Sequence, residues 1–179
     1  MTCFVAFLRG INVGGRSVKK EKLQEAFNSL GFQKTGTYKQ SGNVIFEADS
    51  GNIELIKKKV EVKLQEILGY NVAVFVRTNT QLKDIIKSEP FKGRQNKKNT
   101  SFLVTFLASA PAKFPIELPT LIPKSTAQII SSKGTEIFSE THGNGEGALP
   151  NPFIESKLKV KATTRNMNIV REIVEKYYG

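Results

Sequence analysis

The sequence predicts a mixed α/β (α+β) protein built from two ferredoxin-like, split-βαβ halves whose antiparallel sheets pack together. Three observations predict it. Residues 2–77 give the element order β-α-β-β-α-β. A second series of strand patterns starts at residue 102. The apolar runs 2–8 and 102–108 are continuous, which is typical of strands covered on both faces. We expect one half at residues 1–90 and a second, degenerate half with a C-terminal helix at 91–179.

The first helix is predicted by four apolar residues that recur at helical spacing: Leu23, Ala26, Phe27 and Leu30. Ser17 is the expected N-cap, and Gly31 is expected directly after the helix end. Two short strands follow at 34–39 and 44–48, joined by the polar turn formers of residues 40–43.

The second helix of this half has an apolar stripe of five residues followed by Gly69: Ile53, Ile56, Val60, Leu64 and Ile67. Residues 71–77 then read as a strand and residues 80–87 as a short helix. The first half therefore ends after a complete split-βαβ pattern.

The second half repeats this plan less regularly. After a basic linker and a first strand come a proline-rich connection, two more strands, a glycine-rich loop and two helices. Their expected limits are 91–99 for the linker, 102–108 for the strand, 111–123 for the connection, 127–131 and 136–140 for the strands, and 142–147 for the loop. The last helix is predicted by Met167, Val170, Ile173, Val174 and Tyr177.

Composition limits the chemistry. The 179 residues include 27 Lys and Arg against 16 Asp and Glu, a formal net charge of +11. One Cys and one His exclude a disulfide framework and a Cys/His zinc site, and we expect no metal or cofactor. No apolar run approaches the roughly 18 residues that a membrane span needs, and no secretory signal begins the chain, so we expect a cytoplasmic protein without a membrane partner. The charge indicates an anionic partner or simply a basic protein.

Residues 10–17 have the form G-x-x-x-x-G-R-S between a strand and a helix. A phosphate loop has Lys where this chain has Arg16, and an antiparallel sheet does not suit that enzyme class. Two interpretations stay open. The glycines serve a turn with positive φ, or Arg9, Asn12, Gly14 and Gly15 hold an anion at the helix start.

Two further polar clusters are candidate ligand-binding segments. Gln40, Ser41 and Asn43 supply hydrogen-bonding side chains near a sheet end, although such residues also build tight turns. Residues 163–166 are predicted to open the last helix, with Thr164 as its N-cap. There Arg165 opposes the helix dipole, so it has a partner or is solvated, and Asn166 lies beside it.

The densest basic stretch contains Lys92, Arg94, Lys97 and Lys98, close to Phe91. It indicates either contact with nucleic-acid phosphates or a solvated linker. His142 is alone among polar and glycine residues, which favours a surface loop over a catalytic role.

Three separated segments together resemble a known family. They are residues 4–15 (FVAFLRGINVGG), residues 38–44 (YKQSGNV) and residues 163–166 (TTRN), supported by the Leu-Gly-Phe of residues 30–32. The chain resembles the bacterial DUF1697 family, a domain of unknown function, over essentially its whole length. The resemblance implies a two-part α/β structure of ferredoxin-like halves and no established activity. It also implies that the three polar segments form a shared site, although Met167 stands where family members often have an aromatic residue.

We therefore expect a cytoplasmic protein that binds an anionic ligand: a nucleotide, a phosphorylated metabolite or a nucleic-acid segment. The expected ligand-binding residues are Arg9, Asn12, Gly14, Gly15, Gln40, Ser41, Asn43, Arg165 and Asn166. A small-molecule enzyme using the same polar cluster, or a protein-interaction module, is the alternative. The sequence assigns no catalytic residue and no oligomeric state.

Overall fold

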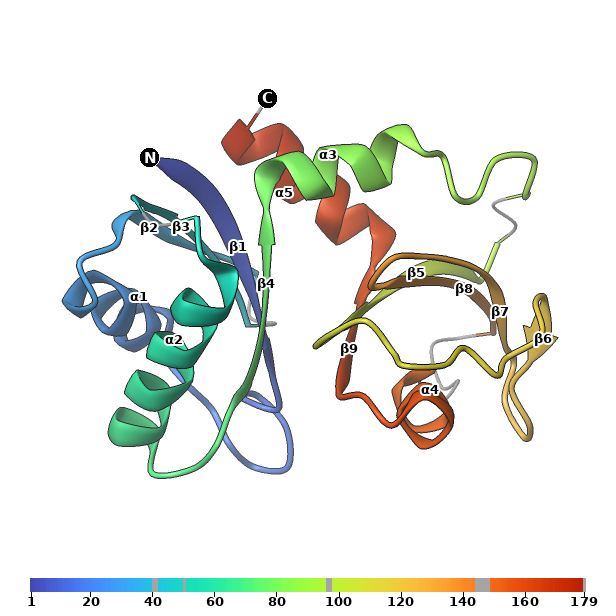
Figure 1. Ribbon diagram of the computed structural model, residues 1–179, viewed down its shortest axis with the longest axis horizontal. Helices are drawn as coiled ribbons and strands as arrows, with labels where there is room; N and C mark the ends of the chain where they lie inside the picture. The colour runs from blue at the N-terminus through green and yellow to red at the C-terminus, as the bar shows by residue number, and fades with distance from the viewer. Residues whose placement is uncertain (40–41, 50, 96–97, 144–148, 179) are drawn as a thin grey trace. The chain divides into compact units, whose positions relative to one another are not determined.

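A computed structural model describes residues 1–39, 42–49, 51–95, 98–143 and 149–178 (Figure 1). Within these residues the chain forms five helices and two antiparallel sheets, so the predicted mixed α/β class is confirmed. The chain divides into two compact units, Met1–Lys83 and Asp84–Gly179. The expected limits of the halves, 1–90 and 91–179, and the packing of one half on the other stay predictions.

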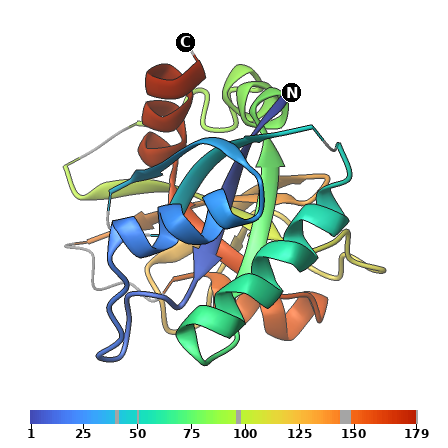
Figure 2. The ribbon, with the colours of Figure 1, turned by 90° about the vertical axis from the view of Figure 1, so that its left-hand side faces the viewer.

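The first unit has the split-βαβ topology. It contains, in chain order, β1 (Thr2–Arg9), α1 (Lys20–Ser29), β2 (Gln33–Tyr38), β3 (Asn43–Ala48), α2 (Ile53–Leu68) and β4 (Ala73–Thr78). The antiparallel sheet has the strand order β2-β3-β1-β4. Figures 1 and 2 show α1 and α2 side by side on one face of this sheet. Its topology is therefore the one predicted from the element order.

The apolar run of β1 is buried on both of its faces. Phe4, Ala6 and Leu8 belong to the core under the two helices, where the Phe4 ring stacks on Phe46 at a centroid distance of 5.5 Å. Val5 and Phe7 alternate with them and are also fully buried. Because successive strand residues point to opposite faces, a run without polar alternation marks this double burial.

The predicted N-cap of α1 is wrong. The helix begins at Lys20, with Lys19 in the N-cap position, and no side chain caps it. The Oδ1 atom of Asn12 accepts a 2.9 Å hydrogen bond from the backbone N–H of Val18, and Lys19 has extended backbone angles. This bond ties the segment before the helix to the β1–α1 loop, so Ser17 lies too early to cap. The predicted end is confirmed, since Gly31 follows the C-cap with φ +81°.

The second unit repeats the same strand order with one helix replaced. After α3 (Asn79–Lys87), which crosses the division between the units, come β5 (Thr100–Leu107), β6 (Thr120–Leu121), β7 (Ala127–Lys133), β8 (Glu136–His142), α4 (Asn151–Leu158), β9 (Ala162–Asn166) and α5 (Met167–Tyr178). The antiparallel sheet has the order β6-β7-β8-β5-β9. Its last four strands repeat β2-β3-β1-β4, with residues 108–119 and the short β6 in the chain position of α1. The predicted degenerate repeat of the strand order is therefore present.

Strand β9 corrects the prediction for residues 163–166, which do not open the last helix. They pair with β5, where Thr164 lies opposite Thr105. Threonine is β-branched and suits a strand, and the Thr164 hydroxyl bonds within the core rather than to a helix terminus. Helix α5 begins at Met167, and Asn166 takes the capping role, because its Oδ1 atom accepts a 2.9 Å hydrogen bond from the N–H of Asn168.

In the part of the chain that the structure describes, every helix is too short or too polar to cross a bilayer.

Candidate functional site

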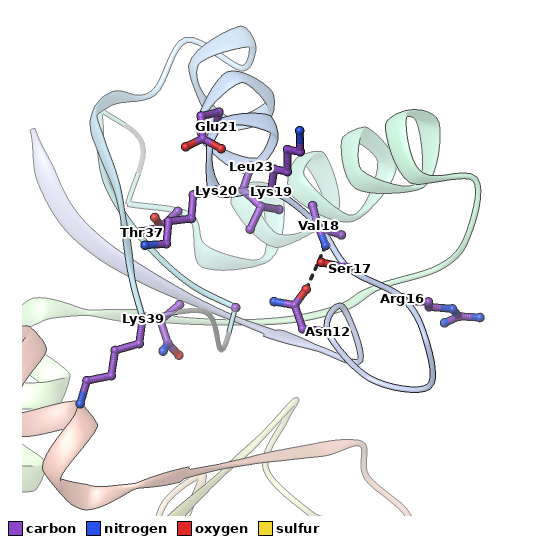
Figure 3. A pocket seen from close by; sticks show the side chains of 12 residues that line it. Asn12, Arg16, Ser17, Val18, Lys19, Lys20, Glu21, Leu23, Thr37 and Lys39 are labelled. Atoms are coloured by element: carbon purple, nitrogen blue, oxygen red, sulfur yellow. Dashed lines mark hydrogen bonds between the residues drawn. The ribbon is translucent and has the colours of Figure 1, made fainter.

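A cavity of about 520 Å³ opens in the first unit beside the start of α1 (Figure 3). The β1–α1 loop, the first turn of α1 and the facing ends of β2 and β3 form its walls. The lining residues are Asn12, Arg16, Ser17, Val18, Lys19, Lys20, Glu21, Leu23, Thr37, Lys39, Gly42 and Asn43. Most of these side chains are polar, so the cavity suits a hydrophilic ligand.

Positive charge dominates the lining. Four cationic residues, Arg16, Lys19, Lys20 and Lys39, line the cavity together with one carboxylate, that of Glu21. The Lys39 ammonium extends away from Lys20 and lies 5.4 Å from the centroid of the Tyr38 ring (Figure 3). Arg16 lies at the rim and points away from the centre, since its guanidinium carbon is 4.2 Å from the centroid of the Tyr70 ring. Lys20 extends toward Thr37 on β2, and among the described residues neither Lys19 nor Lys20 has an ion-pair partner (Figure 3).

The start of α1 adds to this positive potential. The first backbone N–H groups of any helix lack partners within the helix, and here no side chain caps them. The helix dipole favours anions at this end, so Lys19 and Lys20 stand against the ordinary preference for acids. A bound anion would balance both the dipole and the lysines.

Two bonds hold the polar wall in place. Asn12 is fixed by the hydrogen bond that its Oδ1 atom accepts from the Val18 N–H. Asn43 is fully buried, and its Nδ2 atom donates a 3.1 Å hydrogen bond to the carbonyl of Tyr38 across the β2–β3 connection. Asn43 therefore anchors the connection that leads into the cavity wall.

Gly42 is required where this connection meets β1. Its φ is +70°, and its carbonyl accepts a 2.7 Å hydrogen bond from the N–H of Leu8. A Cβ atom at this position would lie 3.0 Å from both Ile11 Cδ1 and the Leu8 carbonyl oxygen. Only glycine allows the backbone to approach β1 this closely.

The cavity brings together two of the predicted ligand-binding residues, Asn12 and Asn43. Arg9, half-buried at the end of β1, is not among its lining residues, nor are Gly14 and Gly15. Gly14 and Gly15 have φ of +60° and +80°, as the turn interpretation predicts.

The other predicted residues of the site cannot be joined to it. Gln40 and Ser41 lie outside the described residues, and Arg165 and Asn166 belong to the second unit. The sequence patterns did not predict three of the lining residues: Lys19, Lys20 and Lys39. Their one signal was the placement of two lysines where a helix start normally has acids.

The second unit contains a separate cavity of about 380 Å³, and Asn166 lines it. Two members of the predicted basic stretch, Lys92 and Arg94, line it as well. Lys97 lies outside the described residues, and Lys98 is exposed.

Arg165 is held by its own strand. Its Nη1 atom donates 2.9 Å hydrogen bonds to Thr163 Oγ1 and to the carbonyl of Thr164. Burial lowers the pKa of Arg165 to about 10, so the guanidinium remains charged at neutral pH. The earlier choice between a partnered and a solvated Arg165 is thus decided for a partnered one.

His142 ends β8 and is exposed, with its Nδ1 atom 3.1 Å from Thr100 Oγ1 and its Nε2 atom 3.6 Å from Glu140 Oε1. Within the described ranges, no three His, Cys, Asp or Glu side chains gather as metal ligands would.

Comparison with known proteins adds family and fold. A family model described as "Protein of unknown function (DUF1697)" matches residues 1–136. Among solved structures, conserved bacterial protein SP0830 from Streptococcus pneumoniae is similar, with a TM-score of 0.68 and 18% sequence identity. The match covers 100% of this chain and 99% of that one, and at this identity it shows the fold alone. No curated protein matches.

Proposed function

Because the chain belongs to the DUF1697 family of proteins of unknown function, as its sequence segments indicated, we infer its function from the site itself. We propose that the protein binds a phosphate-bearing small molecule in the cavity beside α1. The ligand class is a nucleotide or a phosphorylated metabolite. One observation carries the proposal: four cationic residues and one carboxylate line a cavity at an uncapped helix start.

Size and chemistry agree with this ligand class. A volume of about 520 Å³ falls within the range usual for small-molecule sites. The Lys20 and Lys39 ammonium groups supply charge, and the first N–H groups of α1 supply directed hydrogen bonds to phosphate oxygens. The Asn12 amide and the Thr37 hydroxyl are polar groups suited to the rest of the ligand. A cytoplasmic location is part of this proposal, since a lone thiol such as Cys3 persists in a reducing compartment.

Thermal melts and titration calorimetry test the proposal with inorganic phosphate, ATP, glucose 6-phosphate and glucose. We expect the phosphate-bearing probes to raise the melting temperature and glucose to have no effect. The affinity should fall as salt rises, because the contacts are ionic and partly exposed.

Lys20→Gln and Lys39→Gln should each weaken binding about tenfold, since a charge-assisted hydrogen bond contributes about 1.5–3 kcal/mol. The matched control is Lys22→Gln, which removes an equal charge from an exposed position of α1 outside the cavity lining. An unprotected wild type, or an equal loss of affinity in Lys22→Gln, would refute the proposal.

A further inference from the structure

The second unit has a cavity of a different chemical character. About 380 Å³ is enclosed by the segment after α3, the first residues of β5 and the junction of β9 with α5. The lining residues are Glu89, Phe91, Lys92, Arg94, Thr100, Ser101, Phe102, Asn166, Asn168 and Arg171. All belong to one unit, so this site does not depend on the cavity beside α1.

Its apolar part is a supported aromatic ring. The Phe102 ring stacks on Phe91 with centroids 4.5 Å apart and planes 26° apart. Phe91 is buried and meets Phe138 edge-on at 6.0 Å, whereas Phe102 is half-buried. Phe91 therefore backs Phe102 from the interior, and Phe102 offers a rigid ring to a planar ligand.

Amide and hydroxyl groups stand beside this ring. Asn166 Oδ1 accepts a hydrogen bond from the N–H of Asn168, and the Nδ2 atom of the same side chain is a hydrogen-bond donor in the cavity lining. The exposed Asn168 amide and the Ser101 hydroxyl add further hydrogen-bonding groups to the lining. Amide side chains next to an aromatic ring are the usual means of recognising the edge of a nucleobase.

Three cationic residues line the cavity, and they differ in whether a carboxylate already pairs with them. Arg94 Nη1 lies 2.6 Å from Oε1 of the buried Glu140, and Lys92 Nζ lies 3.2 Å from Oε2 of the exposed Glu89. Arg171 is exposed, and no carboxylate among the described residues pairs with it. Arg171 is therefore the guanidinium best placed to take a phosphate group.

We propose that this cavity binds a nucleotide unit, with the base stacked on Phe102 and met by Asn166, and with the phosphate paired to Arg171. Single-stranded nucleic acids and free nucleotides are both recognised by this combination of a stacking ring, amide donors and a basic rim. The unit is supplied either as a free mononucleotide or as part of a single strand.

Calorimetry with AMP, ribose 5-phosphate and a short oligoadenylate tests the proposal on the full chain. AMP should bind at least about tenfold more tightly than ribose 5-phosphate, because only AMP carries the stacking base. An oligoadenylate that binds much more tightly per site than AMP identifies a strand as the source, and equal affinities identify a mononucleotide. Equal binding of AMP and ribose 5-phosphate, or no binding of AMP, overturns the proposal.

Variants localise the binding. Phe102→Leu should reduce AMP affinity about tenfold, and Asn166→Asp should do the same while keeping the oxygen that caps α5. Arg171→Gln should weaken AMP binding, whereas Lys133→Gln, an equal charge loss at the exposed end of β7, should not. Unchanged AMP affinity in Asn166→Asp overturns the assignment even if Phe102→Leu fails to fold.

The two proposed sites fail separately. Lys20→Gln should weaken the binding of inorganic phosphate about tenfold and leave the preference for AMP over ribose 5-phosphate intact. Loss of that preference in Lys20→Gln would assign the base to the cavity beside α1 and refute the site at Phe102.

Discussion

The hydroxyl oxygens of Thr105 and Thr164 lie 2.7 Å apart in the interior of the second unit, and Thr164 in turn donates a hydrogen bond to Oδ1 of Asn151. Asn151 completes the chain by donating from Nδ2 to the carbonyl of Ala162 at 3.3 Å. Thr105, Thr164 and Asn151 are all buried. Strands β5 and β9 and helix α4 are therefore joined by polar groups that satisfy one another.

Thr164→Val should lower the free energy of unfolding by about 1–3 kcal/mol, because it leaves two buried polar groups without a partner. Urea unfolding measures the change. Thr126→Val is the matched control, since it breaks a 2.9 Å hydroxyl bond to Thr141 at an exposed position. A loss in Thr126→Val as large as that in Thr164→Val would contradict the argument from burial.

Gly42→Ala should destabilise the first unit by about 2–4 kcal/mol, from a left-handed backbone and from crowding against Ile11 and the Leu8 carbonyl. Gly14→Ala separates these causes, because Gly14 has φ +60° and open space around its Cα. It should cost about 1–2 kcal/mol. Equal losses in the two variants, measured by chemical denaturation, would show that crowding at Gly42 contributes nothing.

Arg94→Gln should cost about 1–3 kcal/mol, because it removes a charge-assisted bond from the buried Glu140. The comparison variant Lys92→Gln breaks an exposed pair with Glu89 and should change stability by less than about 1 kcal/mol. Thermal unfolding of both variants decides the point. An equal fall in the melting temperatures of Arg94→Gln and Lys92→Gln would show that the burial of Glu140 does not strengthen its bond to Arg94.

Glu47 makes stability depend on pH. The hydrogen bond from the Lys34 ammonium, 3.0 Å away, lowers the pKa of Glu47 below its ordinary value of 4.5. A carboxyl whose pKa is lowered by folding stabilises the folded state above the ordinary value, and this contribution is lost as pH falls through the folded value. Lys34→Gln should therefore be less stable than wild type at neutral pH, with a difference that shrinks below about pH 4.5.

The check is a set of urea unfolding curves from neutral to acid pH, together with an NMR titration of Glu47. Lys57→Gln serves as the control, because it breaks a 3.6 Å ion pair with Glu54 elsewhere in the same unit. A stability difference between Lys34→Gln and wild type that does not vary with pH would rule out this coupling.

Apolar periodicity predicted most of the fold. Helices α1 and α2 bury side chains at helical spacing, and strands β1 and β5 bury continuous apolar runs, so the positions of all four could be predicted from the sequence. Strand β9 could not. Its sequence, ATTRN, is mostly polar, and its buried threonines are held by hydrogen bonds rather than by apolar alternation. The start of α1 was also misplaced, because the hydrogen bond from Val18 N–H to Asn12 Oδ1, which holds the preceding segment, spans a loop and follows no helical or capping pattern.

The candidate site was predicted only in part. Asn12 and Asn43 were identified, since they stand in polar turns beside glycines. Lys20 and Lys39 were not, because a single lysine in sequence looks like an ordinary solvated residue. Both line the same cavity because β2 pairs with β3 and because α1 begins where it does, and local spacing reveals neither.

The polar chain from Thr105 through Thr164 to Asn151 fixes more than stability. A strand of apolar residues can shift its register by two residues and still present apolar side chains to the core. In β9 such a slip would remove Thr164 from Thr105 and place Ala162 or Asn166 there instead. The hydrogen-bond network therefore fixes the register of β9 against β5. It sets the residue at which the strand ends, and so it determines where Asn166 lies in the cavity wall.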